Sequence, residues 1–130
     1  GAVLGVFLAQ KLSGLPFTIV GDGRQKRDFI YVTDVAEAFI AAAGSKVENA
    51  VFNVGTGQPQ SIDYLVSLLG GEKTYIPKRP GEPDCTWADI TKIKQFLGWQ
   101  PEVSFAEGIK LVVKNIENII FSQKSTKKCF

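Results

Sequence analysis

The sequence predicts an α/β fold with about five helices, short strands and an incomplete sheet. Apolar residues recur at helical spacing in five segments, and short β-branched or aromatic segments lie between them. Strands and helices alternate from Arg27 to Leu69, which is the order that builds an α/β sheet. The 130 residues contain too few strands to complete such a sheet, so we expect the missing strands to precede Gly1.

The first predicted elements are a helix and a hairpin. The helix covers residues 2–12, and the first strand covers residues 17–20. The turn Gly21–Gln25 contains Asp22-Gly23, a dipeptide typical of hairpins because glycine accepts a positive φ. Residues 27–32 are mostly aromatic or β-branched, so we expect a second strand that pairs antiparallel with the first.

Two helices with a buried strand between them are expected next. Asp34 and Glu37 have the spacing of a capping box at the start of a helix. The apolar run 51–54 predicts a buried strand that ends at the loop Gly55-Thr56-Gly57. Ser61 is a suitable cap for the helix that follows.

The second half of the chain predicts brief strands, two helices and a tail. Strands are expected at residues 74–76 and 85–88, on either side of a charged loop at 77–83. A helix over 90–97 follows, and the capping box Ser104–Glu107 opens the longest helix. We therefore divide the chain into a folded region, residues 1–121, and a frayed, Lys-rich tail, residues 122–130.

Composition excludes several classes of function. A net charge of +2, with no aromatic residues interleaved among the cations, argues against nucleic acid as a partner. No apolar run is long enough for a membrane helix. Histidine is absent, and Cys85 and Cys129 have no metal-ligand spacing, so we expect no metal site and no Ser-His-Asp triad. Two unpaired cysteines are typical of a reduced, cytoplasmic protein.

Three segments carry candidate ligand-binding side chains. They are the basic turn Arg24–Arg27, the loop Lys78–Glu82 and the segment Asn53–Gly57. Arginine suits phosphate because its planar fork donates two parallel hydrogen bonds and keeps its charge. Two arginines from separate loops would clamp a diphosphate. Asn53, at the end of a predicted strand, offers both a donor and an acceptor.

Each segment also has a purely structural interpretation. Arg27 can be a surface arginine paired with Asp22 or Asp28, and the cations of the later loop can serve solubility. Gly55-Thr56-Gly57 lacks the third glycine of a dinucleotide-binding loop and also fits a plain strand-to-helix connection. Asn53 can simply satisfy backbone groups at a strand end.

The segment Gly21–Val35 resembles the signature G-D-G-x-Q-x-R-D-F-x-Y-V-x-D-V of nucleotide-sugar epimerases and dehydratases, the extended short-chain dehydrogenase/reductase family. The resemblance extends from Gly1 to about Ile120 and includes further motifs in the family's order. These are Phe52-Asn53-Val54-Gly55, Arg79-Pro80-Gly81-Glu82 with Glu for the family's Asp, Trp87-Ala88-Asp89, Leu97-Gly98-Trp99-Gln100-Pro101 and Glu107-Gly108.

The resemblance implies the carboxyl-terminal, substrate-binding portion of an extended Rossmann-type, NAD(P)-binding epimerase fold. Its ligand would be a nucleotide-diphosphate sugar linked to UDP, dTDP, GDP or CDP, with Arg27 and Arg79 on the diphosphate. The resemblance also implies that four further residues contact the nucleotide: Asn53, Gln25, Thr18 and Glu82.

The family binds NAD through a Gly-rich turn and performs catalysis with a Tyr-x-x-x-Lys pair, transiently oxidising the sugar at C4. Tyr31, Tyr64 and Tyr75 are not followed by Lys at the fourth position. We therefore expect no catalytic residue and no cofactor site in this chain, with NAD bound before Gly1 in a homodimeric parent enzyme. Two alternatives stay open: a non-catalytic nucleotide-sugar-binding or scaffolding module, and a relative that has lost phosphate binding, against which the two arginines argue.

Overall fold

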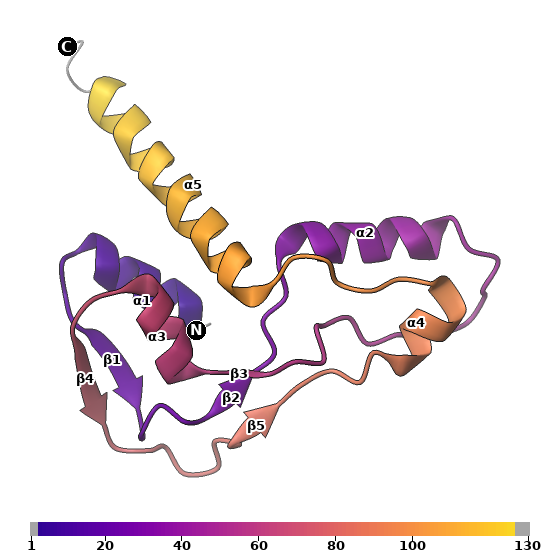
Figure 1. The fold of residues 1–130 in the computed structure, drawn as a ribbon, viewed down its shortest axis with the longest axis horizontal. Coiled ribbons are helices and arrows are strands. Elements are labelled where there is room, and N and C mark those ends of the chain that lie inside the picture. Colours follow the sequence, from indigo (N-terminus) through magenta and orange to yellow (C-terminus); the bar gives the residue numbers. More distant parts are fainter. Residues whose placement is uncertain (1–2, 127–130) are drawn as a thin grey trace.

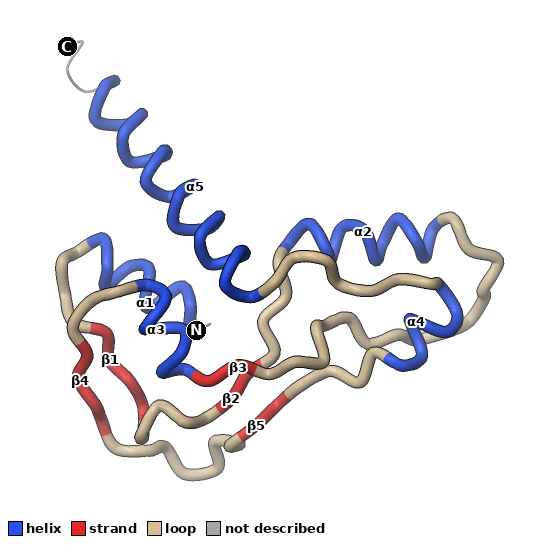
Figure 2. Tube along the Cα trace, in the orientation of Figure 1, coloured by secondary structure: helices blue, strands red, loops and turns tan. Residues whose placement is uncertain are grey.

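Two small sheets and five helices make up the part of the chain that the computed structural model describes, residues 3–126, with side chains through residue 118 (Figures 1 and 2). The predicted class, α/β with about five helices and incomplete sheets, is confirmed. In chain order the elements are α1 (Val3–Leu12), β1 (Phe17–Val20), β2 (Lys26–Arg27), α2 (Val32–Ala43), β3 (Gln60–Ser61), α3 (Ile62–Leu69), β4 (Lys73–Ile76), β5 (Cys85–Thr86), α4 (Thr91–Leu97) and α5 (Phe105–Thr126).

The strands pair across long stretches of sequence. β1 runs parallel to β4, with Phe17 opposite Lys73 and Val20 opposite Ile76. β2 lies between β3, which is antiparallel to it, and β5, which is parallel. The predicted hairpin between residues 17–20 and 27–32 is therefore wrong, and the second strand is only two residues long.

The turn after β1 explains this difference. Gly21 and Gly23 both have positive φ, as expected of the turn, but the Gly21 N–H donates to the Ile76 carbonyl and so continues the pairing with β4. The chain then crosses to the second sheet. The strand ends at Arg27, the last residue that pairs with β3 and β5, and the side chain of the next residue, Asp28, bonds to Thr56 and Ala88.

The larger hydrophobic core lies between the first sheet and three helices. α1 and α3 lie beside the β1–β4 pair, and α5 packs against α3 (Figure 1). The rings of Phe7 and Phe17 are 5.4 Å apart, which joins α1 to β1. The buried side chains of this core are Phe7, Phe17, Ile19, Ile62, Leu65, Val66, Leu69 and Ile109.

A smaller core joins α2 to α4 and contains Ala38, Ile93 and Trp99. Asp34 is buried and lies in the first turn of α2, where the N-cap residue is Tyr31, so the prediction that Asp34 caps α2 is wrong. Its carbonyl accepts a hydrogen bond from Trp99 Nε1 (3.1 Å), and its carboxylate accepts one from the Val103 N–H (3.1 Å). These two bonds connect the first turn of α2 to Trp99 and Val103.

The predicted strand at residues 51–54 is absent from the structure. Val51 is 83% exposed, and no strand of the described chain lies beside this segment to pair with it. Side chains satisfy part of its backbone instead, since Lys92 Nζ donates to the Val51 carbonyl (2.9 Å).

Two of the predicted caps are confirmed, because they depend on local geometry. The Ser61 hydroxyl accepts from the Tyr64 N–H (3.1 Å), and the Ser104 hydroxyl accepts from the Glu107 N–H (3.3 Å). α5 continues to Thr126, into the segment predicted as a tail. The division of the chain at residue 121 into a folded region and a tail stays a prediction. Residues 1–2 and 127–130 lie outside the described residues.

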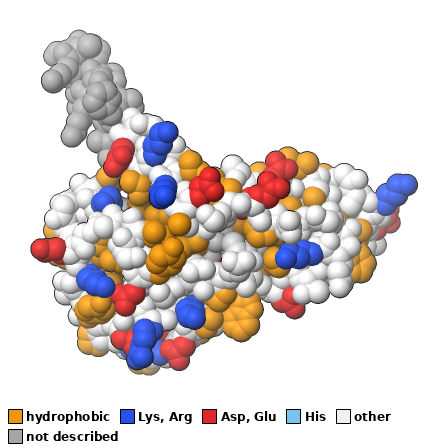
Figure 3. All heavy atoms as spheres, in the orientation of Figure 1, with side chains coloured by type: hydrophobic (Ala, Val, Ile, Leu, Met, Phe, Trp, Pro, Cys, Tyr) orange, Lys and Arg blue, Asp and Glu red, His pale blue; other side chains and the backbone are white. Residues whose placement is uncertain are grey.

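Acidic, basic and hydrophobic side chains are interspersed on the face drawn in Figure 3. Several large apolar side chains are exposed, among them Val32, Phe39 and Ile40 on α2. Within residues 3–126, no helix has the combination of length and apolarity that a membrane crossing needs.

Candidate functional site

Five of the six predicted binding residues line one hollow of about 190 Å³, which we call the arginine hollow: Thr18, Gln25, Arg27, Arg79 and Glu82. They come from β1, the turn after it, β2 and the loop between β4 and β5. The parallel pairing of β1 with β4, and of β2 with β5, brings these distant segments together.

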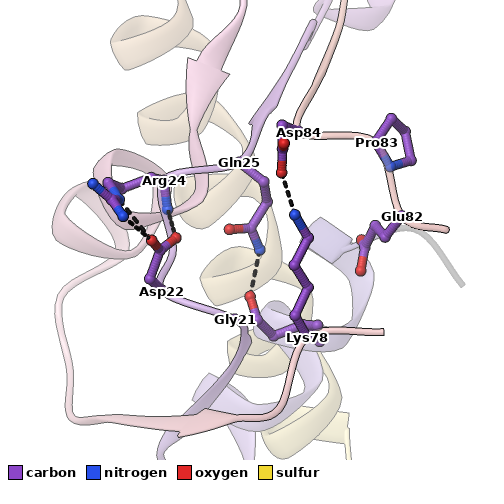
Figure 4. Close-up of a pocket in the computed structure, with 9 residues that line it drawn as sticks. Gly21, Asp22, Arg24, Gln25, Lys78, Glu82, Pro83 and Asp84 are labelled. Carbon is purple, nitrogen blue, oxygen red and sulfur yellow. Dashed lines mark hydrogen bonds and ion pairs between the residues drawn. The ribbon is translucent and has the colours of Figure 1, made fainter. Parts of the chain in front are cut away.

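A second hollow of about 510 Å³ adjoins the first, and we call it the turn hollow (Figure 4). It shares Gln25 and Glu82 with the arginine hollow. Its cations are already paired, Arg24 with Asp22 and Lys78 with Asp84. These exposed pairs leave the turn hollow with little free positive charge.

Arg27 projects from β2, and its guanidinium donates hydrogen bonds to two carbonyls and one carboxylate. Nη1 donates to the carbonyls of Lys26 (2.8 Å) and Pro83 (2.9 Å), and Nη2 donates to the Glu82 carboxylate (3.2 Å). The side chains of Arg27 and Glu82 are 22% and 32% exposed. The partner of Arg27 is therefore Glu82, and the alternative pairing with Asp22 or Asp28 is wrong.

Arg79 lies on the same loop as Glu82 and is exposed. Within the described side chains, no hydrogen-bond acceptor meets its guanidinium. The Glu82 N–H donates to the Arg79 carbonyl (3.4 Å), so one turn of the loop carries both residues. Arg79 is therefore a cation at the hollow that is available to a ligand.

Thr18 and Gln25 are fixed by neighbouring groups. The Gln10 side chain on α1 makes two hydrogen bonds to Thr18: it donates to the Thr18 hydroxyl (2.8 Å) and accepts from the Thr18 N–H (3.1 Å). Gln25 Nε2 donates to the Val20 carbonyl (2.6 Å). This bond orients the Gln25 amide and leaves its oxygen as the group able to accept from a ligand.

Asn53 does not join the other five residues. It lies in a third, open hollow with Asp28 and Trp87, and its Nδ2 donates to the Asp89 carbonyl (3.3 Å). Arg27 also lines this hollow, so the third hollow and the arginine hollow share Arg27.

Asp28 is an important residue at the site that sequence reasoning missed. Its carboxylate accepts from the N–H groups of Thr56 (2.9 Å), Gly57 (3.0 Å) and Ala88 (3.1 Å), and from the Thr56 hydroxyl. The available signal was the Gly55-Thr56-Gly57 loop, because consecutive N–H groups in such a loop form an anion-binding concavity. The anion is Asp28, which takes the N–H groups that a phosphate would need.

Hydrogen bonding also sets the ionisation of Asp28. Burial of the carboxylate opposes its charge, but the bonds from the Thr56 hydroxyl and from three backbone N–H groups outweigh burial and lower the pKa of Asp28 below its usual range. The charged carboxylate therefore ties β2 to the segments on either side of the third hollow.

Gly55 packs against this carboxylate, and Gly55→Ala is expected to lower the free energy of unfolding by about 2 kcal/mol. A Cβ there would lie 2.6 Å from both Ala88 Cβ and the Asp28 carboxylate. Urea denaturation measures the effect. Gly5→Ala is the control, because Gly5 lies in α1 with open space around it and should gain stability. Equal effects of the two changes would contradict the packing.

Comparison with known proteins places the chain in a family. The profile of the NAD dependent epimerase/dehydratase family matches residues 1–55, and that of GDP-mannose 4,6 dehydratase matches residues 71–112. A putative UDP-glucose 4-epimerase of Methanocaldococcus jannaschii is 38% identical over 122 residues, which are 89% of this chain and 39% of that protein. UDP-glucuronic acid decarboxylase 1 of Xenopus tropicalis is 34% identical, over 87% of this chain and 28% of that protein.

Solved structures agree with these matches. UDP-glucose 4-epimerase of Thermotoga maritima, determined with UDP-glucose, has a TM-score of 0.84 at 36% identity and covers 92% of this chain. UDP-glucuronic acid 4-epimerase of Bacillus cereus, in complex with UDP-glucuronic acid and NAD, has a TM-score of 0.82 at 32% identity and covers 91%. The chain belongs to the NAD-dependent epimerase/dehydratase family, and it spans between 28% and 40% of the length of these relatives.

Proposed function

We propose that this chain forms the nucleotide-sugar-binding part of an NAD-dependent epimerase or dehydratase, with Arg27 and Arg79 holding the diphosphate. The observation that carries the proposal is their convergence on one hollow from β2 and from the loop after β4. A diphosphate has two charged groups, which suits two guanidinium forks from different segments.

The ligands of two relatives support a UDP-linked sugar as the ligand class. The Thermotoga maritima relative was determined with UDP-glucose, and the Bacillus cereus relative with UDP-glucuronic acid. We infer that UDP is the first nucleotide to test, ahead of dTDP, GDP and CDP. In this arrangement Thr18 and Gln25 would lie toward the base, Glu82 near the ribose, and Asn53 toward the phosphates from the far side of Arg27.

We assign NAD binding and the sugar chemistry to residues outside this chain. One observation supports this assignment: the N–H groups of Thr56 and Gly57, in the loop most similar to a dinucleotide-binding turn, are bound to Asp28. We therefore expect the isolated chain to be inactive. An NAD titration tests this directly, and micromolar affinity for the isolated chain would contradict it.

Titration of the chain with UDP tests the diphosphate site. Arg27→Ala and Arg79→Ala should each weaken UDP binding by about 10- to 100-fold, because each removes a charge-assisted hydrogen bond to phosphate. Calorimetry gives the affinities, and chemical shifts of the free variants show whether each still folds.

Arg24→Ala is the matched control. It removes the same charge from the neighbouring turn, where the Arg24 side chain is exposed and paired with Asp22. Its UDP affinity should stay within about twofold of the parent chain, apart from a salt-dependent part that screening removes. UDP binding that survives in both of the other variants, or falls equally in Arg24→Ala, would overturn the proposal.

A further inference from the structure

We propose that Glu82 is an internal counter-ion that occupies Arg27 in the free protein and leaves it when a diphosphate binds. Glu82 then sets the affinity of the site by competing with the ligand. The inference rests on the proposed diphosphate function and adds to it a residue that opposes binding. The inference also gives a physical role to Glu82, which stands where the similar motif of the family has Asp.

The first support is the state of the Arg27 guanidinium. Its three contacts are the Lys26 carbonyl, the Pro83 carbonyl and the Glu82 carboxylate, all from its own chain. The Glu82 carboxylate is the charged one, at 3.2 Å from Nη2. Both side chains are largely shielded from solvent, so their attraction is stronger than that of an exposed pair. A phosphate that accepts from the Nη2 N–H now bonded to Glu82 has to replace this carboxylate.

The second support is the place available to Glu82 after it leaves. Its side chain borders both the arginine hollow and the turn hollow (Figure 4). The turn hollow is larger, about 510 Å³ against about 190 Å³, and contains the Lys78 cation. A rotation of the Glu82 side chain away from Arg27 would place its carboxylate in this larger hollow, where Lys78 is already paired with Asp84.

The third support is the loop that carries Glu82. The preceding residue, Gly81, has a φ of 77°, and a Cβ added there would meet no atom within 4 Å, so the loop is not packed against other atoms on this side. The turn bond from the Glu82 N–H to the Arg79 carbonyl links the two residues. A movement of the backbone at Glu82 would therefore also move Arg79.

Glu82→Gln tests the inference, because it removes the competing charge and keeps the shape of the side chain. We expect UDP to bind about fivefold more tightly to this variant than to the parent chain. The matched control is Asp84→Asn, which removes the same charge from the same loop. Asp84 pairs with Lys78 and does not contact Arg27, so its effect should be smaller and should vanish at high salt.

A double variant isolates the contact. In the Arg27→Ala background, Glu82→Gln should no longer raise the UDP affinity, since the two residues act on each other. Weaker UDP binding by Glu82→Gln, or a gain equal to that of Asp84→Asn, would overturn the counter-ion role. If Arg27→Ala leaves UDP affinity unchanged, or the parent chain does not bind UDP, the proposed function itself fails and this inference fails with it.

Discussion

Asp28→Ala is expected to lower the free energy of unfolding by about 3 kcal/mol. Three backbone N–H groups, those of Thr56, Gly57 and Ala88, lose their acceptor, and each partly buried bond contributes about 1 kcal/mol. Urea denaturation followed by tryptophan fluorescence gives the difference. Asp22→Asn is the control, because that carboxylate is exposed and should change stability much less than Asp28→Ala does. A loss no larger than the control's would contradict the role of Asp28.

The same residue predicts how stability depends on pH. The native pKa of Asp28 lies below its unfolded value, so its contribution is present above the unfolded pKa of about 4 and is lost as pH falls through the native pKa. The stability gap between the parent chain and Asp28→Asn should therefore be largest near neutral pH and narrow in acid. Denaturation curves from pH 7 to pH 3 measure it, and a constant gap would contradict the prediction.

Trp99→Ala should have a still larger effect, about 4 kcal/mol on the free energy of unfolding. Trp99 is 6% exposed and packs with Ala38 and Ile93, so its removal leaves a cavity between α2 and α4. The variant also loses the bond from the indole N–H to the Asp34 carbonyl. Urea denaturation followed by circular dichroism measures the loss.

Two controls separate packing from hydrogen bonding at this site. Trp99→Phe keeps most of the ring and removes the N–H donor, so it should cost about 1–2 kcal/mol. Trp87→Ala removes a tryptophan that is 62% exposed and should cost less than about 1 kcal/mol. If the two alanine variants were equally unstable, the smaller core would not be the reason.

Features that depend on neighbours in sequence were predictable. Ser61 and Ser104 cap their helices because the N–H groups that they accept from lie three residues away. Strand pairing was not predictable, because β1 pairs with a strand whose sequence gives no sign of its partner. Asp34 fits a cap by local rules, but Trp99 and Val103, far along the chain, hold it inside.

The candidate site was also predictable only in part. Arg27 and Arg79 were identified through the motifs that contain them, and both line one hollow in the structure. The contact between Arg27 and Glu82 was not foreseen, because the two residues are 55 positions apart and the path of the loop after β4 cannot be read from the sequence. Asp28 was considered only as a neighbour of Arg27. Its true partners depend on the path of the chain after residue 50.

The contacts of Asp28 also fix when this region can be completed during synthesis. Its carboxylate bonds to Thr56, 28 positions later, and to Ala88, 60 positions later. A ribosome that adds 5–20 residues per second needs about 3–12 s to make those 60 residues. Until Ala88 has been made, the carboxylate lacks one of its partners and stays open to water. The hollow that Arg27 and Arg79 line likewise cannot form until Arg79 has been made.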